Sequence, residues 1–446
     1  MNLERAAIIQ NNPDALKVVA SAARISTQQG TALGIYAKSG DKEKDTKLVG
    51  KVLSSGHKSV IEHQMVAIAF DNVSVLVEQF VIEFRLASFT VKSRRYVDFA
   101  DAGYVQPEGM NEQVREIYSK RTCELFELYQ KLMDMGIPKE DARFVLPYGF
   151  RSNFLMTVNA RELISMIRAM LIGRGSRYPE LKNIGNQLKE QFDQIYPGVI
   201  DAELTRSADE IPEGACGPIL MGKAVEAEIR LLGEPKNPVQ LLDTAMRFGR
   251  RFNGFDAENM RALMLDARPR ELEVLSYNFR INNVSLATVT HFTRHRMLSL
   301  QLRHELSALS DGNYILPETI SSNEEACRLY CAAFETQTKA ALEAKEAGAN
   351  DSQLPYFAMA GHTTSMLISM NARELLHFAK VRSCSRAQWE IRAIARAMIE
   401  LLNETDSCEI FRNYGPSCAI TGKCPEGAMC CGHPVKIENG VWKESR

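Results

Sequence analysis

Two short motifs occur twice in this 446-residue chain at nearly the same separation. Asn-Ala-Arg-Glu-Leu stands at 159–163 and again at 371–375, which is 212 residues later. Asn-Val-Ser stands at 72–74 and again at 283–285, which is 211 residues later. Because chance does not keep two motifs in register, the sequence predicts two homologous domains produced by an internal duplication.

The join between the two repeats is marked by residues that break regular structure. The segment 211–218 contains two prolines and two glycines, too many for the interior of a helix or strand. The predicted organisation is a first domain at 1–212, a second at 222–415 and a cysteine-rich tail at 416–446. The length is ample for two cores of roughly 200 residues each.

Each repeat is expected to have an α+β fold. Apolar residues recur at three- and four-residue spacings from 371 to 403, which predicts one amphipathic helix or two in sequence. The segment 64–70 predicts a strand, followed by a turn at Asp71-Asn72 and a helix over 75–84.

Composition narrows the classes of function. A net charge of -1 provides no general basic field for nucleic acid or for an anionic membrane, so any recognition of phosphate must be local. The chain has no apolar run near the ~20 residues of a membrane span and no signal-peptide pattern. We therefore expect a cytoplasmic protein, in which the ten cysteines are reduced.

The second repeat contains three adjacent cationic or potentially cationic side chains, Arg294, His295 and Arg296. Arginine makes two-point contacts with phosphate and carbonyl oxygens, so the cluster suits an anionic cofactor. An exposed basic surface is the alternative interpretation. The first repeat has Glu-Phe-Arg at the corresponding positions, 83–85, and has lost the cluster.

A second polar cluster, His57, Ser59, Glu62 and His63, precedes the predicted strand of the first repeat. The neighbouring Glu62 and His63 would point to opposite faces of a strand, so we predict no metal site here. Cofactor contacts and ordinary exposed polar side chains are the two interpretations left. The second repeat has no histidine in the matching stretch, 268–273.

The sequence Lys-Ser-Arg-Arg-Tyr at 92–96 offers a hydroxyl group, two guanidiniums and an aromatic face. Together these groups could hold a nucleoside monophosphate, although a basic surface would have the same composition. The second repeat lacks both guanidiniums at the corresponding positions.

These motifs, together with Ala-Gln-Trp-Glu-Ile at 387–391, resemble the flavin-dependent thymidylate synthase family. The resemblance implies an α+β domain that forms homotetramers, with FAD and dUMP bound where subunits meet. It also implies methylene transfer from methylenetetrahydrofolate to dUMP, followed by reduction to dTMP with electrons from NADPH. No catalytic nucleophile of the enzyme is expected.

The resemblance assigns site residues position by position. The implied FAD contacts are His57, Ser59, Arg294, His295, Arg296, Asn371 and Arg373. The implied dUMP contacts are Ser93, Arg95, Arg143 and Arg382.

The losses in the two repeats are complementary. The first repeat has Met170 at the position of Arg382, and the second has Asp351 at the position of Arg143. We therefore expect one composite set of site residues drawn from both repeats, in a homodimer that imitates the family's tetramer. The alternatives are a flavin-dependent methylase or hydroxymethylase of another pyrimidine nucleotide, and a non-catalytic protein that binds FAD or a nucleotide.

Three departures from the family pattern concern the nucleotide. Thr90-Val91 replaces Asn-Glu before Ser93, Arg94 replaces a glycine, and His291 replaces a glutamine. The side chain of Val91 cannot accept a hydrogen bond from a base or ribose, so the identity of the nucleotide is open.

The tail contains cysteines that could serve as metal ligands or as free thiols. Their spacing differs from the common Cys-x2-Cys pattern, so zinc, an iron–sulfur cluster and free or redox-linked thiols are alternatives. The residues concerned are Cys418, Cys424, Cys430, Cys431 and His433.

Overall fold

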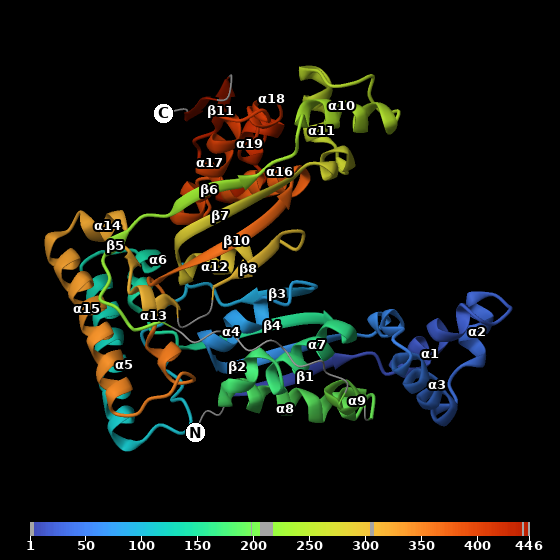
Figure 1. Cartoon of the computed structure of the whole chain (residues 1–446), viewed down its shortest axis with the longest axis horizontal. Helices are drawn as coiled ribbons and strands as arrows, with labels where there is room; N and C mark the ends of the chain where they lie inside the picture. The colour runs from blue at the N-terminus through green and yellow to red at the C-terminus, as the bar shows by residue number, and fades with distance from the viewer. Residues whose placement is uncertain (1–3, 198, 206–216, 304–306, 439–440, 445–446) are drawn as a thin grey trace. The chain divides into compact units, whose positions relative to one another are not determined.

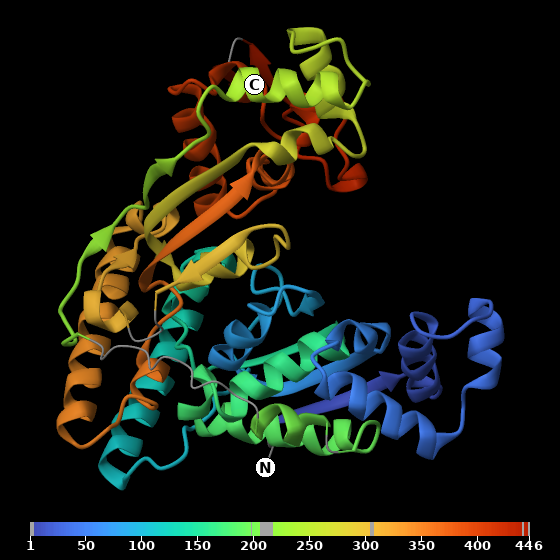
Figure 2. The ribbon, with the colours of Figure 1, turned by 45° about the vertical axis from the view of Figure 1, so that its right-hand side comes forward.

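The computed structural model describes residues 4–197, 199–205, 217–303, 307–438 and 441–444. Its internal contacts divide the chain into two compact units (Figures 1 and 2). Unit 1 comprises Met1–Gly222, Leu306–Gly312 and Pro317–Gly361, and unit 2 comprises Lys223–Glu305, Asn313–Leu316 and His362–Arg446. Most of 306–361, which belongs to the second repeat, thus packs with the first repeat. The boundaries 1–212, 222–415 and 416–446 stay predictions, and most of the predicted linker lies outside the described residues.

Unit 1 contains a four-stranded antiparallel sheet in the order β1-β2-β4-β3. Helix α8 packs against β1 and α7 packs against β4 (Figure 1). Buried and exposed side chains alternate along much of β2 and β4, as expected for a sheet with one covered face. The bounds are β1 Arg5–Asn11, β2 Met65–Ser74, β3 Ala87–Val91, β4 Arg151–Asn159, α7 Ala160–Leu171 and α8 Pro179–Asp193.

Two long helices of unit 1, α5 (Glu112–Asp134) and α15 (Glu324–Glu346), lie side by side and antiparallel (Figure 1). The ion pair of Lys131 with Glu325 joins the end of one helix to the start of the other at 3.1 Å. Asn111 Nδ2 donates to the carbonyl of Ala347 at 2.7 Å at the opposite end. Both helices have 23 residues and begin after an asparagine cap, which fits their origin in equivalent parts of two repeats.

Unit 2 contains a second four-stranded antiparallel sheet, in the order β6-β7-β10-β8. Alternate residues of β7 are buried, and Tyr277, Phe279 and Ile281 form part of a core that α16 and α17 also supply. The bounds are β6 Glu228–Gly233, β7 Ser276–Ser285, β8 Ser299–Leu302, β10 Thr363–Asn371, α16 Ala372–Arg382 and α17 Trp389–Asn403. The periodicity over 371–403 therefore corresponds to two helices in sequence.

Shorter elements complete both units. Unit 1 also contains α1 Ala15–Ile25, α2 Ala32–Lys38, α3 Lys42–Ser54, η1 Lys58–His63, α4 Val75–Ile82, α6 Lys139–Ala142, η2 Arg143–Val145, η3 Arg174–Arg177, α9 Val199–Thr205, α13 Ser307–Asp311, α14 Glu318–Ser321 and η5 Leu354–Phe357. Unit 2 also contains β5 Ala224–Val225, α10 Pro238–Phe248, α11 Ala257–Leu265, η4 Arg270–Val274, α12 Leu286–Phe292, β9 Tyr314–Ile315, α18 Cys408–Phe411, α19 Ser417–Thr421, η6 Gly427–Met429, β11 Val435–Glu438 and β12 Val441–Glu444. Of the described helices, none is long and apolar enough to cross a bilayer.

The strand expected at 64–70 and the helix expected at 75–84 are confirmed by β2 and α4, but the turn expected at Asp71-Asn72 is wrong. Strand β2 continues to Ser74, and its pairing with β4 shifts register between Phe70 and Val73. Asn72 has a φ of 56° in this bulge, and its amide donates to Asn153 Oδ1 at 3.0 Å. Asparagine tolerates the left-handed region, so a turn residue serves here as a bulge residue. Asn283 repeats the feature with a φ of 58°.

A buried glutamate bonds to a buried serine in each unit. Ser74 caps α4, and Glu180 accepts hydrogen bonds from its amide at 2.8 Å and its hydroxyl at 2.7 Å. Ser285 caps α12, and Glu390 accepts the same two bonds at 2.8 and 2.5 Å. The shared sheet order and this shared contact support the duplication inferred from sequence.

Glu180 generates a prediction about pH. Burial raises its pKa from the ordinary value of 4.5 to about 7, despite hydrogen bonds from Ser74 and Tyr356. The folded protein therefore binds a proton that the unfolded chain releases, so this contribution to stability is present below pH 4.5 and is lost as pH rises through about 7. Between these pH values the wild type should lose about 3 kcal/mol of its free energy of unfolding through this group. Glu180→Gln should not show this loss, because the glutamine does not titrate.

Calorimetric unfolding of both proteins at several pH values measures this difference. A Glu180→Gln protein with the same pH dependence as the wild type would contradict the prediction. Thr244→Ala, on the exposed face of α10, is a control that should leave the pH dependence unchanged.

Candidate functional site

The Arg294-His295-Arg296 cluster follows α12 in unit 2, and its members face different environments. His295 is 3% exposed, whereas Arg294 and Arg296 are exposed. His295 Nδ1 lies 2.7 Å from Glu374 Oε1. Burial lowers the pKa of His295 and outweighs the opposing effect of the Glu374 carboxylate, so the ring is neutral at pH 7.

Arg382, the last residue of α16, contacts the same histidine. Its Nε donates to His295 Nε2 at 3.0 Å, and its Nη2 donates to the carbonyl oxygen of His291 at 3.3 Å. Burial, followed by the positive charge of Arg294, lowers the pKa of Arg382 to about 10. The structure thus brings Arg382 into contact with His295 and under the influence of Arg294.

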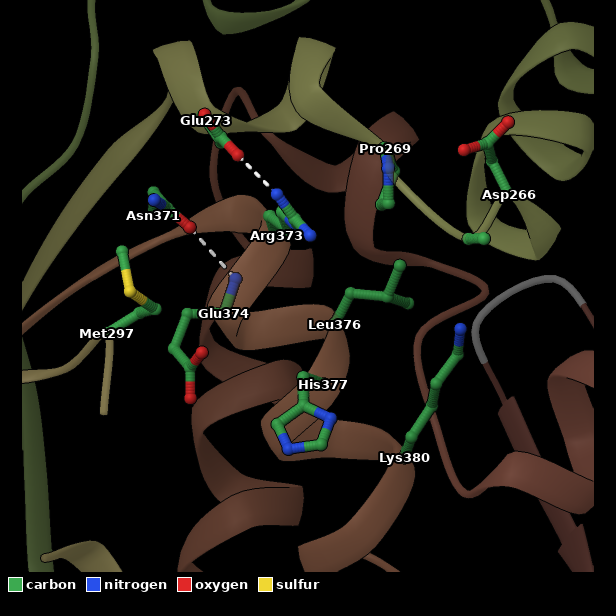
Figure 3. Close-up of a pocket in the computed structure, with 11 residues that line it drawn as sticks. Asp266, Pro269, Glu273, Met297, Asn371, Arg373, Glu374, Leu376, His377 and Lys380 are labelled. Atoms are coloured by element: carbon green, nitrogen blue, oxygen red, sulfur yellow. Dashed lines mark hydrogen bonds and ion pairs between the residues drawn. The ribbon is translucent and has the colours of Figure 1, made fainter. Parts of the chain in front are cut away.

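A cavity of about 390 Å³ lies beside this cluster in unit 2 (Figure 3). Asn371 caps α16 by accepting the amide of Glu374 at 2.9 Å, and Arg373 forms an ion pair with Glu273. The cavity is lined by Asp266, Ala267, Pro269, Glu273, Met297, Asn371, Arg373, Glu374, Leu376, His377 and Lys380. Two of the expected cofactor residues, Asn371 and Arg373, therefore share one cavity.

The sequence analysis missed the basic cavity residues His377 and Lys380. They follow Arg373 by four and seven residues, helical spacings that would have placed all three side chains on one face of α16. Lys380 Nζ donates to the carbonyl oxygen of Met264 at 2.8 Å, and burial lowers the pKa of this lysine. The cavity wall therefore combines a guanidinium, an ammonium and an imidazole.

Unit 1 brings together the expected nucleotide residues Ser93, Arg95 and Arg143 around Glu140. Arg95 Nε lies 2.7 Å from Glu140 Oε1, and Arg143 Nε donates to the Glu140 carbonyl at 3.0 Å. Ser93 Oγ accepts the amide of Arg95 at 3.3 Å. Sequence reasoning missed Glu140, because no motif distinguishes a lone carboxylate on a short helix.

Arg94 differs from its neighbour Arg95 in its surroundings. It is 9% exposed and forms a buried ion pair with Glu78, which also accepts a hydrogen bond from Ser152. One guanidinium of the Arg94-Arg95 pair is thus part of the core. The departure from the family's glycine at this position therefore has a structural explanation.

His57 and Ser59 are exposed at the start of η1, just before β2. Glu62, on the same element, forms an ion pair with Arg161 at 2.6 Å. The structure thus places His57 and Ser59 on an exposed element of unit 1.

The first repeat has apolar side chains where the second has its hydrogen-bonded cluster. Phe84 corresponds to His295, and the fully buried Met170 corresponds to Arg382. The ring of Phe84 packs against Phe80 with centroids 5.7 Å apart. Equivalent polar chemistry is therefore absent from this part of the described first repeat.

Metal ligands are one alternative that the sequence offers for the cysteines of the tail. In the portions of the chain that the structure describes, no group of three histidine, cysteine, aspartate or glutamate side chains is arranged to hold a metal ion. Cys424 and Cys430 lie within hydrogen-bond reach of each other, and Cys431 contacts Ser385. These cysteines are free thiols, and Cys424 and Cys430 are close neighbours.

The fold and site define an α+β protein with guanidinium-rich surfaces suited to anionic ligands. The sequence matches the family described as Thymidylate synthase complementing protein over residues 7–198 and 230–406, and the chain belongs to that family. The two matched segments fit a tandem duplication.

Curated relatives match about one repeat each. A flavin-dependent thymidylate synthase of Geobacter sulfurreducens is 34% identical over 170 residues, covering 37% of this chain and 72% of the relative. Another from Clostridium tetani is 26% identical over 251 residues, covering 49% of this chain and 98% of the relative. A solved structure, the UMP/dUMP methylase PolB of Streptomyces cacaoi bound with 5-Br dUMP, is 22% identical with a TM-score of 0.39, covering 46% and 96% of the two chains.

Proposed function

We propose that this chain reductively methylates dUMP to dTMP, using FAD, methylenetetrahydrofolate and NADPH. Its family makes it an enzyme of the methyltransferase type, and a flavin cofactor and folate-derived donor accompany that assignment. The observation that carries the proposal is the linked group of Arg382, His295 and Glu374 beside the cavity of Asn371 and Arg373. The roles of NADPH as reductant and of dUMP as substrate are part of the proposal.

The cavity residues fit a flavin cofactor with phosphate groups. Arg373 and Lys380 supply positive charge, and the amide of Asn371 supplies a further polar contact at the cavity wall. We assign Arg294 and Arg296 to the same cofactor because both are exposed and the adjacent Met297 lines the cavity. The family resemblance assigns His57 and Ser59 of the first repeat to it as well. Bound flavin would supply the hydride that reduces the transferred carbon.

Ser93, Arg95, Arg143 and Arg382 are assigned to the nucleotide. Arg95 pairs with the carboxylate of Glu140 and Arg143 donates to its carbonyl oxygen, so both arginines contact one residue. Two guanidiniums anchored to one residue suit a shared phosphate. Both repeats are needed for a full set, because neither keeps all the residues. A methylase or hydroxymethylase of another pyrimidine nucleotide is the second candidate, favoured by Val91 in place of a hydrogen-bonding side chain.

The proposed activity has a direct test. The purified protein should be yellow, NADPH should reduce its flavin, and incubation with 5-tritiated dUMP should release tritium. A non-catalytic flavin protein would be yellow but would release none. Tritium release from labelled UMP but not from labelled dUMP would show that UMP, and not dUMP, is the substrate.

Cofactor binding can be tested with two matched variants. Arg373→Ala should lower flavin affinity about ten- to a hundredfold, since a charge-assisted contact is worth roughly 1.5 to 3 kcal/mol. Arg161→Ala is the control, because Arg161 occupies the same motif and forms the same kind of ion pair, with Glu62, in the other repeat. An equal loss of flavin absorbance in both variants would contradict the assignment of the flavin site to the second repeat.

We also propose that the chain works as a homodimer, so that four family-like domains form the assembly. The mass measured in solution by light scattering should be about twice the chain mass of 50.0 kDa. An assembly of four chains would contradict this arrangement, since it would contain eight such domains.

A further inference from the structure

A buried chain of hydrogen bonds runs from a carboxylate through an imidazole to a guanidinium. Glu374 is 7% exposed and His295 is 3% exposed, and Arg382 completes the chain. Its direction is fixed because a guanidinium only donates. His295 Nε2 must accept from Arg382, so the single ring proton lies on Nδ1 and is donated to Glu374. Both nitrogens of His295 are thus used within the protein, and neither is left to bond a cofactor.

Arg382 retains hydrogen-bond donors for a ligand. Its Nε bonds to His295 and its Nη2 bonds to the carbonyl of His291. Across the described residues, no acceptor is recorded for Nη1. The positive charge of Arg294 also acts on Arg382, and two like charges held near each other favour an anion beside them.

We propose that Glu374 and His295 are positioning residues that hold the guanidinium of Arg382 in the orientation that binds the anionic nucleotide. This inference rests on the proposed function, which supplies the nucleotide as ligand. It assigns His295 to the nucleotide through Arg382, and leaves the exposed Arg294 and Arg296 for the cofactor.

The physical benefit is preorganisation. An arginine side chain with free torsions loses conformational freedom when it binds, and that loss weakens affinity. Because the hydrogen bond to His295 fixes Arg382 Nε before the ligand binds, this conformational entropy is lost during folding and not during binding. The neutral tautomer with its proton on Nδ1 is also required. A proton on His295 Nε2 would place an N–H donor opposite the N–H donor of Arg382, and the hydrogen bond would be lost.

The decisive experiment measures dUMP affinity by calorimetry, with flavin content and melting temperature recorded for each variant. His295→Leu should bind dUMP about ten- to a hundredfold more weakly while keeping its flavin. His295→Gln should restore binding to within about threefold, because its amide oxygen can accept from Arg382 Nε. Glu374→Gln serves as a milder variant if the leucine protein fails to fold, and should bind dUMP more weakly than the wild type.

The first repeat supplies the matched control. Glu162 occupies the same position as Glu374 in the identical Asn-Ala-Arg-Glu-Leu motif, but Phe84 and Met170 stand where His295 and Arg382 would be. Glu162→Ala should therefore leave dUMP affinity within about twofold of the wild type.

A pH series separates positioning from a general structural effect. The groups that act on His295 are Glu374 and His377 of α16, and Arg382 at its end. Burial keeps the pKa of His295 below its ordinary value, so wild-type affinity should fall as pH drops through this lowered pKa and the ring gains a second proton. His295→Gln should lack this step, while the titration of the nucleotide phosphate is common to both proteins.

The outcomes are distinguishable. A wild-type protein that does not bind dUMP would overturn the proposed function, and this inference with it. If the wild type binds dUMP but the leucine and glutamine variants bind equally well, only the positioning of Arg382 is wrong. The same conclusion follows if the pH step persists in His295→Gln.

Discussion

In each unit a buried carboxylate bonds to the serine that ends a strand and begins a helix. In unit 1 Glu180 binds Ser74, and in unit 2 Glu390 binds Ser285. Removing one partner would leave a polar group buried without its bond, at a cost of about 1 to 3 kcal/mol. This contact therefore fixes the strand end, the helix that follows and the later helix that carries the glutamate. His295 follows α12, which this contact orients, and Arg382 ends α16, which packs against the α17 that carries Glu390.

The sequence predicted the features that depend on local order. Repeated motifs predicted an internal duplication, which the shared sheet order supports. Periodicity over 371–403 predicted one helix or two, and the structure has two, because burial of one helix face imposes a spacing. Motif position also placed Asn371 and Arg373 in one cavity. The bulge at Asn72 was mistaken for a turn, since the same left-handed backbone serves both and only pairing with β4 distinguishes them.

Other features depend on contacts between distant segments and leave no local signal. Glu140 binds Arg95 from 45 residues away, and Glu374 binds His295 from 79 residues away. The inward direction of His295 between two exposed arginines likewise comes from packing against α16. The Arg373–Glu273 pair has a counterpart in Arg161–Glu62, so a shared motif marks common framework as readily as it marks a ligand site.

Helix α15 comes from the second repeat but packs along α5 of the first, and the following segment contributes Tyr356 to the buried Glu180. A chain ending near residue 222 would lack that helix and that hydroxyl, and would expose the apolar side of α5 to water. The two copies are thus joined by shared parts as well as by a peptide link. Gene fission at the repeat boundary would produce aggregation-prone fragments, which gives selection a physical reason to keep the tandem arrangement in one reading frame.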